Sequence, residues 1–178
     1  MSEYGIVTEA GTIRFERLLP APIERVWDYL TDPELRRTWF AGGETERKPG
    51  GRMTLLFRNS ELAPGEETPE QYRKYEGMEM EGRIIRFEPP RLLVHSWREE
   101  NDSDSEVTFE LSEQGDKTRL VLTHRNLPNR AELVGVAGGW HTHLALLEDI
   151  LADRQPRPFW SNHSRNAAEY EERIDAGA

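Results

Sequence analysis

The segment from Leu133 to Leu151 constrains the fold of this chain more than any other. Its apolar residues recur at spacings of three and four, the period of a helix with one broad apolar face. They are Leu133, Val136, Ala137, Trp140, His143, Leu144, Leu147 and Leu151. Asn129 followed by Glu132 is typical of a helix N-terminus. A long helix of this kind needs a second element to cover its apolar face.

The segments before this helix alternate apolar and polar residues with the period of two expected of half-buried strands. They are 12–19, 45–48, 53–57, 75–87, 92–97, 107–111 and 120–124. Two short helices are expected after the first strand, over 23–30 and from Pro33 to about Trp39. Short turns join the last four strands, which favours an antiparallel meander. The sequence therefore predicts an α+β fold, with a curved antiparallel sheet of about seven strands wrapped around the long helix.

The length of 178 residues suits one well-buried domain. We expect this domain over residues 1–155, because Pro156 and Pro158 end the long helix. Residues 156–178 are expected to be a C-terminal extension that docks as a short helix. The polar segment 59–73 is interpreted as a solvated loop, with a lid as the alternative.

Charge and composition exclude several classes of function. The net charge is −10, from 33 acidic and 23 basic side chains, and an acidic surface disfavours nucleic acids and anionic membranes. The chain has no cysteine, and therefore no disulfide, thiolate zinc site or thiol nucleophile. Neither a signal peptide nor a run of 18 apolar residues is present. The sequence therefore predicts a cytoplasmic protein without membrane insertion.

Several short motifs occur in an order that resembles a known superfamily. They are 21–27 (APIERVW), 30–33 (LTDP), Trp39-Phe40, 49–51 (PGG), 89–93 (PPRLL), Trp97, 118–120 (TRL), Gly139-Trp140 and His143-Leu144. Over roughly residues 12–153 the chain resembles the START-like, or SRPBCC, helix-grip superfamily. Within it, the chain resembles the family named after activators of the heat-shock-protein ATPase. The resemblance implies a helix-grip fold with an internal cavity, in a superfamily that includes carriers, cyclases, hydrolases and cochaperone parts.

We expect the cavity to be lined by inward residues of the sheet and the long helix. The predicted set is Trp39, Phe57, Met78, Met80, His95, Trp97, Phe109, His124, Trp140, His143 and Leu147, with Leu93, Val107 and Leu122 beside them. Such mostly apolar walls with a few polar groups suit a hydrophobic or amphipathic small molecule. The alternative is that these residues only pack the core. No cofactor is expected.

The candidate catalytic groups are His95, His124 and His143, which alternation places inside. A buried neutral imidazole can move a proton near pH 7, or it can serve as a satisfied core group. Glu79, Glu81 and Glu110 fall on the opposite phase of their strands, so no carboxylate pair is expected to face the cavity. We therefore regard an enzyme as the less favoured interpretation.

Two further motifs in the long helix have competing interpretations. His141 and His143 are two residues apart and point away from each other, so they cannot bind one metal ion, and no metal is expected. The glycines Gly138 and Gly139 either bring a ligand or the sheet close to the backbone, or allow a tight crossing against Trp27 or Trp39.

Three functional hypotheses follow from the sequence. The leading one is binding of a hydrophobic small molecule in the cavity. The second is an interaction module that contacts a chaperone or forms a homodimer through an exposed aromatic patch such as Phe159-Trp160. The third is a cyclase- or hydrolase-like enzyme that uses the cavity histidines.

Overall fold

The computed structural model describes residues 3–97 and 105–175. Its strands are β1 (Ile6–Glu9), β2 (Thr12–Leu19), β3 (Arg52–Phe57), β4 (Met78–Glu88), β5 (Leu92–Trp97), β6 (Ser105–Gln114) and β7 (Lys117–Arg125). Its helices are α1 (Ile23–Thr31), α2 (Pro33–Arg36), α3 (Arg130–Leu151) and α4 (Phe159–Arg173), with short 3-10 helices η1 (Asn59–Leu62) and η2 (Glu70–Tyr75).

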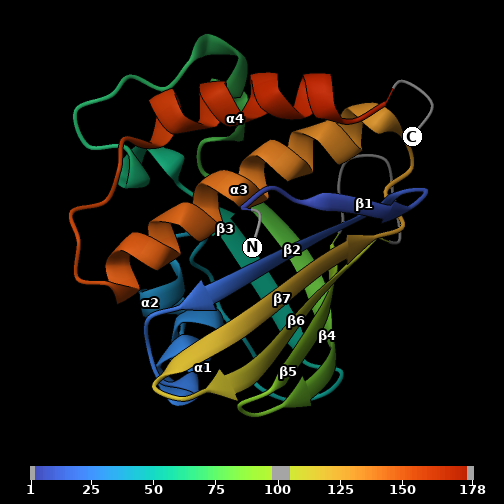
Figure 1. The fold of residues 1–178 in the computed structure, drawn as a ribbon, viewed down its shortest axis with the longest axis vertical. Helices are drawn as coiled ribbons and strands as arrows, with labels where there is room; N and C mark the ends of the chain where they lie inside the picture. The colour runs from blue at the N-terminus through green and yellow to red at the C-terminus, as the bar shows by residue number, and fades with distance from the viewer. Residues whose placement is uncertain (1–2, 98–104, 176–178) are drawn as a thin grey trace.

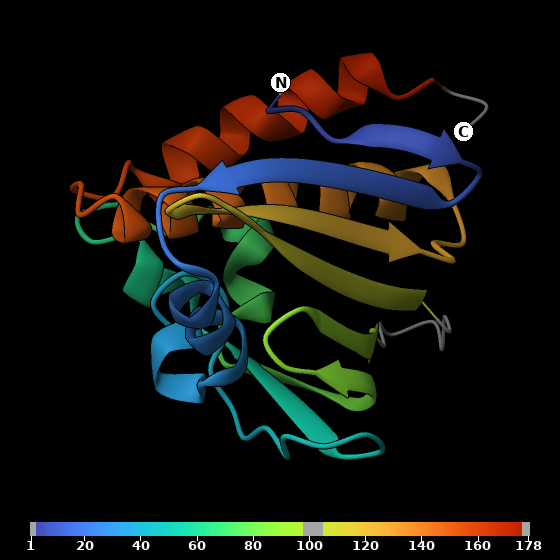
Figure 2. The same ribbon diagram turned by 60° about the horizontal axis from the view of Figure 1, so that its bottom comes forward.

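The seven strands form one antiparallel sheet in the order β1-β2-β7-β6-β5-β4-β3. The sheet is curved and α3 lies across it, while α4 packs along α3 (Figure 1). Figure 2 shows α1 and α2 together at one end of the sheet. This is the α+β helix-grip fold that the sequence predicts. Among the described helices, none is both long enough and apolar enough to cross a membrane.

The core lies between the sheet and α3, and it confirms the predicted alternation. Each strand from β2 to β7 turns its inward residues into this layer, where their side chains are buried; they include Phe15, Leu19, Met53, Leu55, Ile84, Leu93, Val107, Phe109, Leu120 and Leu122. Burial of such side chains stabilises a fold by about 1.5–3 kcal/mol each. The long helix is therefore held against the sheet by the stripe that its spacing predicts.

The sheet differs from the prediction at two strands. The chain folds β1 back on β2 through a turn at Gly11, which has φ 69°, whereas the sequence analysis expected no strand there. Conversely, segment 45–48 forms only an isolated bridge from Thr45 to Met53. The buried Arg36 guanidinium donates hydrogen bonds to the carbonyls of Ala41, Gly42, Gly43 and Thr54. Hydrogen bonds from one side chain therefore hold this loop, instead of the backbone hydrogen bonds of a strand pair.

The helices agree with the prediction at the start of α3 and differ from it at the end of α2 and on the second face of α3. Asn129 accepts a hydrogen bond from the Glu132 amide at 3.0 Å, so the predicted cap of α3 is confirmed. Helix α2 ends at Arg36, earlier than predicted. Helix α3 is buried on a second face as well, under α4, where His141 pairs with Tyr170 and Thr142 with Asn166. These polar contacts explain why the sequence showed only one apolar face.

Candidate ligand pocket

A pocket of about 680 Å³ lies between the first half of α3, the β3–β4 hairpin, segment 59–77 and the start of α4. Its walls are formed by Phe57, Asn59, Tyr72, Tyr75, Met78, Glu79, Met80, Glu81, Trp97, Ala131, Glu132, Gly135, Val136, Gly139, Trp140, His143, Phe159, Trp160 and His163. This volume falls in the range of about 300–1,000 Å³ typical of small-molecule sites. The pocket is partly open, with Gly135 exposed at its edge.

One wall of the pocket is a face of α3 with few side chains. Ala131, Gly135 and Gly139 follow one another at spacings of four, so they lie along one ridge of the helix. A Cβ atom added to Gly135 or Gly139 would meet no heavy atom within 4 Å. Gly138 differs, because a Cβ there would lie 3.4 Å from Ala167 of α4. The close crossing is therefore made with α4, and not with Trp27 or Trp39.

Aromatic side chains form much of the remaining wall. Trp97 and Trp140 meet with their ring centroids 5.6 Å apart. At the other side, Tyr72 stacks on Trp160 at 5.3 Å, and Trp160 meets Phe159 edge to face at 4.8 Å. Rings held against one another in this way give a rigid apolar surface.

Segment 59–77 closes one side of the pocket and is fixed to α4 by Glu66. The Glu66 carboxylate accepts hydrogen bonds from the Trp160 amide at 2.9 Å and from the Ser161 amide at 3.0 Å. Burial raises the pKa of Glu66, but these bonds and the one from the Ser161 hydroxyl outweigh it, so the pKa lies below its usual value. Figure 1 shows the segment beside the first turns of α4. The predicted solvated loop is thus a docked wall containing two 3-10 helices.

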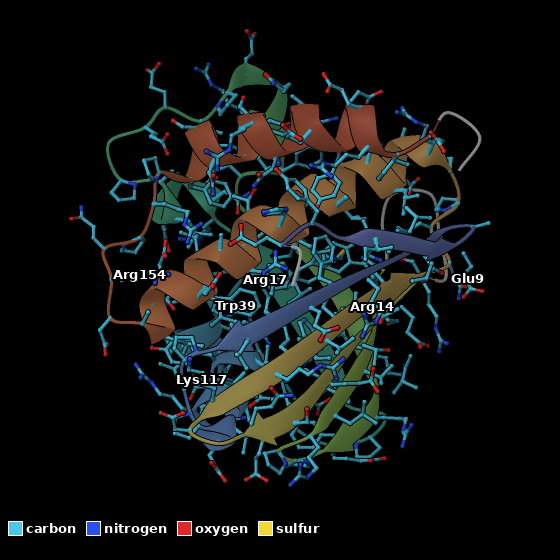
Figure 3. All side chains as sticks on the ribbon, viewed as in Figure 1. Glu9, Arg14, Arg17, Trp39, Lys117 and Arg154 are labelled. Carbon is cyan, nitrogen blue, oxygen red and sulfur yellow. The ribbon has the colours of Figure 1, made fainter. Side chains whose placement is uncertain are left out.

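His143 lines the pocket from α3, as does Glu132. The Nδ1 atom of His143 lies 2.7 Å from the carbonyl oxygen of Trp39. Figure 3 labels Trp39, which follows α2 in the chain. A carbonyl only accepts, so Nδ1 carries the hydrogen and Nε2 keeps a lone pair. Burial lowers the pKa of His143 to about 4, against a smaller opposing effect of the bond to Trp39. His143 is therefore a neutral acceptor at pH 7.

Behind the pocket, a chain of hydrogen bonds fixes two wall tryptophans. Trp140 Nε1 donates to His124 Nδ1 at 3.0 Å, so His124 Nε2 carries the hydrogen and donates to Ser105 Oγ at 3.2 Å. Ser105 in turn donates to the carbonyl oxygen of Trp97 at 2.9 Å. Burial lowers the pKa of His124 to about 3. His124 thus acts as a neutral link that holds the wall in place.

The structure brings six of the eleven predicted site residues to the pocket. These are Phe57, Met78, Met80, Trp97, Trp140 and His143. The other five, Trp39, His95, Phe109, His124 and Leu147, are buried in the packed core and do not line the pocket, and the same holds for Leu93, Val107 and Leu122. Alternation identifies the inward face of a strand, but it does not show where along the strand the interior is hollow.

Several pocket residues were missed by the sequence analysis. Phe159, Trp160 and His163 come from α4, and Asn59, Tyr72 and Tyr75 from segment 59–77. Phe159 and Trp160 are buried, so they do not form the exposed patch expected for a homodimer. An aromatic pair directly after Pro158, at the start of a helix, was the available signal.

Glu79 and Glu81 also line the pocket, although they were expected to face away from it. Residues 78–81 of β4 pair with β3, whereas the described pairing of β4 with β5 begins at Ile84. We infer that the pocket reaches this part of β4 along its edge as well as its inner face.

The structure separates the two helix histidines that the sequence places two residues apart. His141 contacts the Tyr170 hydroxyl at 2.8 Å, on the α4 side of α3, while His143 contacts Trp39. Among residues 3–97 and 105–175, no group of three or more potential metal ligands comes together.

Comparisons with known proteins identify the same fold. The family model described as "Activator of Hsp90 ATPase homolog 1-like protein" matches residues 20–152. A solution structure of a protein from Bordetella parapertussis is 45% identical, with a TM-score of 0.83, and the match covers 96% of this chain and 90% of that chain. The crystal structure of CalU16 from Micromonospora echinospora is 27% identical, with a TM-score of 0.67 and coverage of 95% and 93%.

A third structure, from Rhodobacter sphaeroides, is 26% identical, with a TM-score of 0.60 and coverage of 84% of this chain and 97% of that chain. No curated protein is significantly similar to the chain in sequence. The family match ends before α4, so the pocket wall that Phe159, Trp160 and His163 form lies outside it. The family match therefore covers the sheet and α3 side of the pocket, whereas the first two solved structures match 96% and 95% of the chain and extend beyond it.

Proposed function

This chain belongs to the family of Activator of Hsp90 ATPase homolog 1-like proteins, and from its pocket we propose that it binds a hydrophobic or amphipathic small molecule between the sheet and α3. The observation that carries the proposal is the pocket itself. A volume of about 680 Å³ is walled mainly by aromatic rings, two methionines and bare helix backbone, with Glu79, Glu81 and Glu132 also in its lining. Such a surface favours an apolar guest, because burial of apolar area is favourable by about 25 cal/mol per Å².

The lining of the pocket also contains polar residues, which can orient a largely apolar guest. His143 Nε2 offers a lone pair, and we propose that this atom contacts the polar part of the ligand. The Trp160 Nε1–H and the Asn59 side-chain oxygen are covered by protein and have no hydrogen-bond partner among the described residues.

The same geometry favours binding over the two alternatives from the sequence. His95 and His124 lie outside the pocket, and burial lowers their pKa values to about 4 and about 3. A cyclase- or hydrolase-like mechanism that uses all three histidines therefore lacks a common site. Chaperone regulation and homodimerisation concern outer surfaces, and the feature that supports a function here is internal.

Native mass spectrometry of freshly purified protein, followed by thermal-shift measurements with lipids and aromatic polyketides, tests the proposal. We expect a co-purified mass or a rise in the melting temperature with at least one of these classes. Val136→Trp, which fills the pocket, should abolish the response. Ile85→Trp adds the same ring at an exposed position of β4 outside the pocket, and should respond like the wild type.

Failure of every compound class to bind the wild type would contradict the proposal. So would an equal response of the Val136→Trp variant, because the ligand would then occupy another surface.

A further inference from the structure

The two pocket glycines of α3 have no role in packing. Both lie inside the 22-residue helix, and neither has a positive φ. Glycine in a helix interior is less favourable than alanine by about 0.8–1.0 kcal/mol. Nothing in the described structure compensates for this at Gly135 or Gly139, since a Cβ atom there would meet no neighbour within 4 Å. What glycine provides at these two positions is bare backbone facing the pocket.

We call the ridge formed by Ala131, Gly135 and Gly139 the glycine strip. At a rise of about 1.5 Å per residue it extends for about 12 Å along the pocket. A ridge with no side chain beyond a methyl group allows a flat ring system to approach the peptide planes closely. Three or four fused rings match about this length.

The hydrogen-bonding atoms at one end of the strip indicate which functional group the ligand carries. His143 follows Gly139 by four residues and is 7% exposed, and its Nε2 has no hydrogen-bond partner among the described residues. Trp160 is 6% exposed, and its Nε1–H is also unpartnered. The Phe159 ring contacts both side chains, with centroids 5.2 Å from His143 and 4.8 Å from Trp160. His143 Nε2 is therefore an unpartnered acceptor about one helical turn beyond the end of the strip.

A hydroxyl group donates one hydrogen bond, so it matches the acceptor His143 Nε2. Building on the proposed function, we propose that the ligand is a flat, fused-ring aromatic alcohol that lies on the glycine strip and donates its hydroxyl hydrogen to His143 Nε2. Gly135 and Gly139 are then specificity-determining residues, and His143 is the residue that orients the ligand.

The first test compares one substitution at two neighbouring glycines. Gly139→Leu projects into the pocket, so we expect the melting temperature to rise by about 2–4 °C, from the gain of about 1 kcal/mol in helix propensity. Gly138→Leu projects against Ala167 and should lower it. A Gly139→Leu variant that melts below the wild type, or fails to fold, overturns the assignment of Gly139 to the ligand.

The second test uses two probes that differ in one hydrogen-bond donor. 1-Hydroxypyrene carries the proposed hydroxyl, whereas 1-methoxypyrene keeps the rings and the oxygen but cannot donate. We expect fluorescence titration of the wild type to show about tenfold tighter binding of 1-hydroxypyrene, which is the net contribution of one hydrogen bond of about 1.4 kcal/mol. The Gly139→Leu variant should bind both probes at least tenfold more weakly.

His143→Asn makes the second test specific to Nε2. The asparagine amide retains a donor for the Trp39 carbonyl and lacks the Nε2 position, so the preference for 1-hydroxypyrene should fall to about one. Equal binding of both probes by the wild type overturns the role of His143. If lipids bind in the pocket and neither pyrene does, the ligand class is wrong while the proposed function stands. If no apolar compound binds, the proposed function itself is wrong.

Discussion

Lowering the pH from 7.5 to 5.5 should destabilise this protein through its buried histidines. Burial lowers the pKa of His95 to about 4, of His124 to about 3, and of His143 and His141 to about 4. In the unfolded chain a histidine has a pKa of about 6.5. The unfolded state therefore takes up protons first as the pH falls. The stability is fully present above about pH 7 and is lost as the pH falls from about 6.5 to about 4, and for His124 to about 3.

The size of the loss follows from the number of these groups. At pH 5.5 each histidine is about nine-tenths protonated in the unfolded chain and almost entirely neutral in the folded one. Each then lowers the free energy of unfolding by about 1.4 kcal/mol, and the four together by about 5 kcal/mol. Because domains are stable by only about 5–15 kcal/mol, unfolding near this pH is expected. Asp149 does not offset this loss of stability, because the hydrogen bond from Arg157 and other contacts hold its pKa below the usual value in the folded protein.

Urea unfolding followed by tryptophan fluorescence at the two pH values measures this difference. His124→Gln removes one of the four groups, so its pH-dependent loss should be smaller than that of the wild type by about 1.4 kcal/mol. A loss below about 1 kcal/mol for the wild type would refute the argument, because the four imidazoles would then titrate alike in the folded and unfolded chains.

Three substitutions test other parts of the structure. Glu66→Gln weakens the cap of α4 by about 1 kcal/mol, so hydrogen exchange at the Trp160 amide should accelerate; unchanged exchange would show that Glu66 does not fix segment 59–77. Trp140→Phe leaves His124 Nδ1 without its donor and should lower the free energy of unfolding by about 1–3 kcal/mol in chemical denaturation; an unchanged value would mean that the bond is not formed. Arg36→Lys loses the planar guanidinium that reaches several carbonyls and should cost about 3 kcal/mol in the same assay, whereas a neutral result would contradict its role in loop 41–45.

The sequence was sufficient for the fold because its strongest patterns are local. The helical spacing of 133–151 and the alternation of 53–57 or 107–111 report directly on which face of an element is buried. The predicted number of about seven strands agrees with the structure, but the prediction included segment 45–48, which is not a strand, and omitted β1. The bonds that fix these regions, such as those of Arg36 to distant carbonyls, leave no periodic signal.

The pocket was harder to predict, because its position depends on where the packing stops. His95 and Phe57 both point inward from the sheet, yet His95 stacks near Phe109 in the core while Phe57 lines the pocket. Nor does a pattern in the sequence show that Trp160 packs on Tyr72, from a segment far along the chain. Gly139 was noted as a possible site of close ligand approach, but only the structure separates it from Gly138.

Methyl NMR of the methionines in the presence of 1-hydroxypyrene tests the central claim most directly. Met78 and Met80 line the pocket, whereas Met53 is buried in the core outside it. A ring system bound between the sheet and α3 should shift the methyl resonances of Met78 and Met80 by ring currents and leave Met53 nearly unchanged. Saturable binding that moves neither Met78 nor Met80 would contradict a ligand site in this pocket.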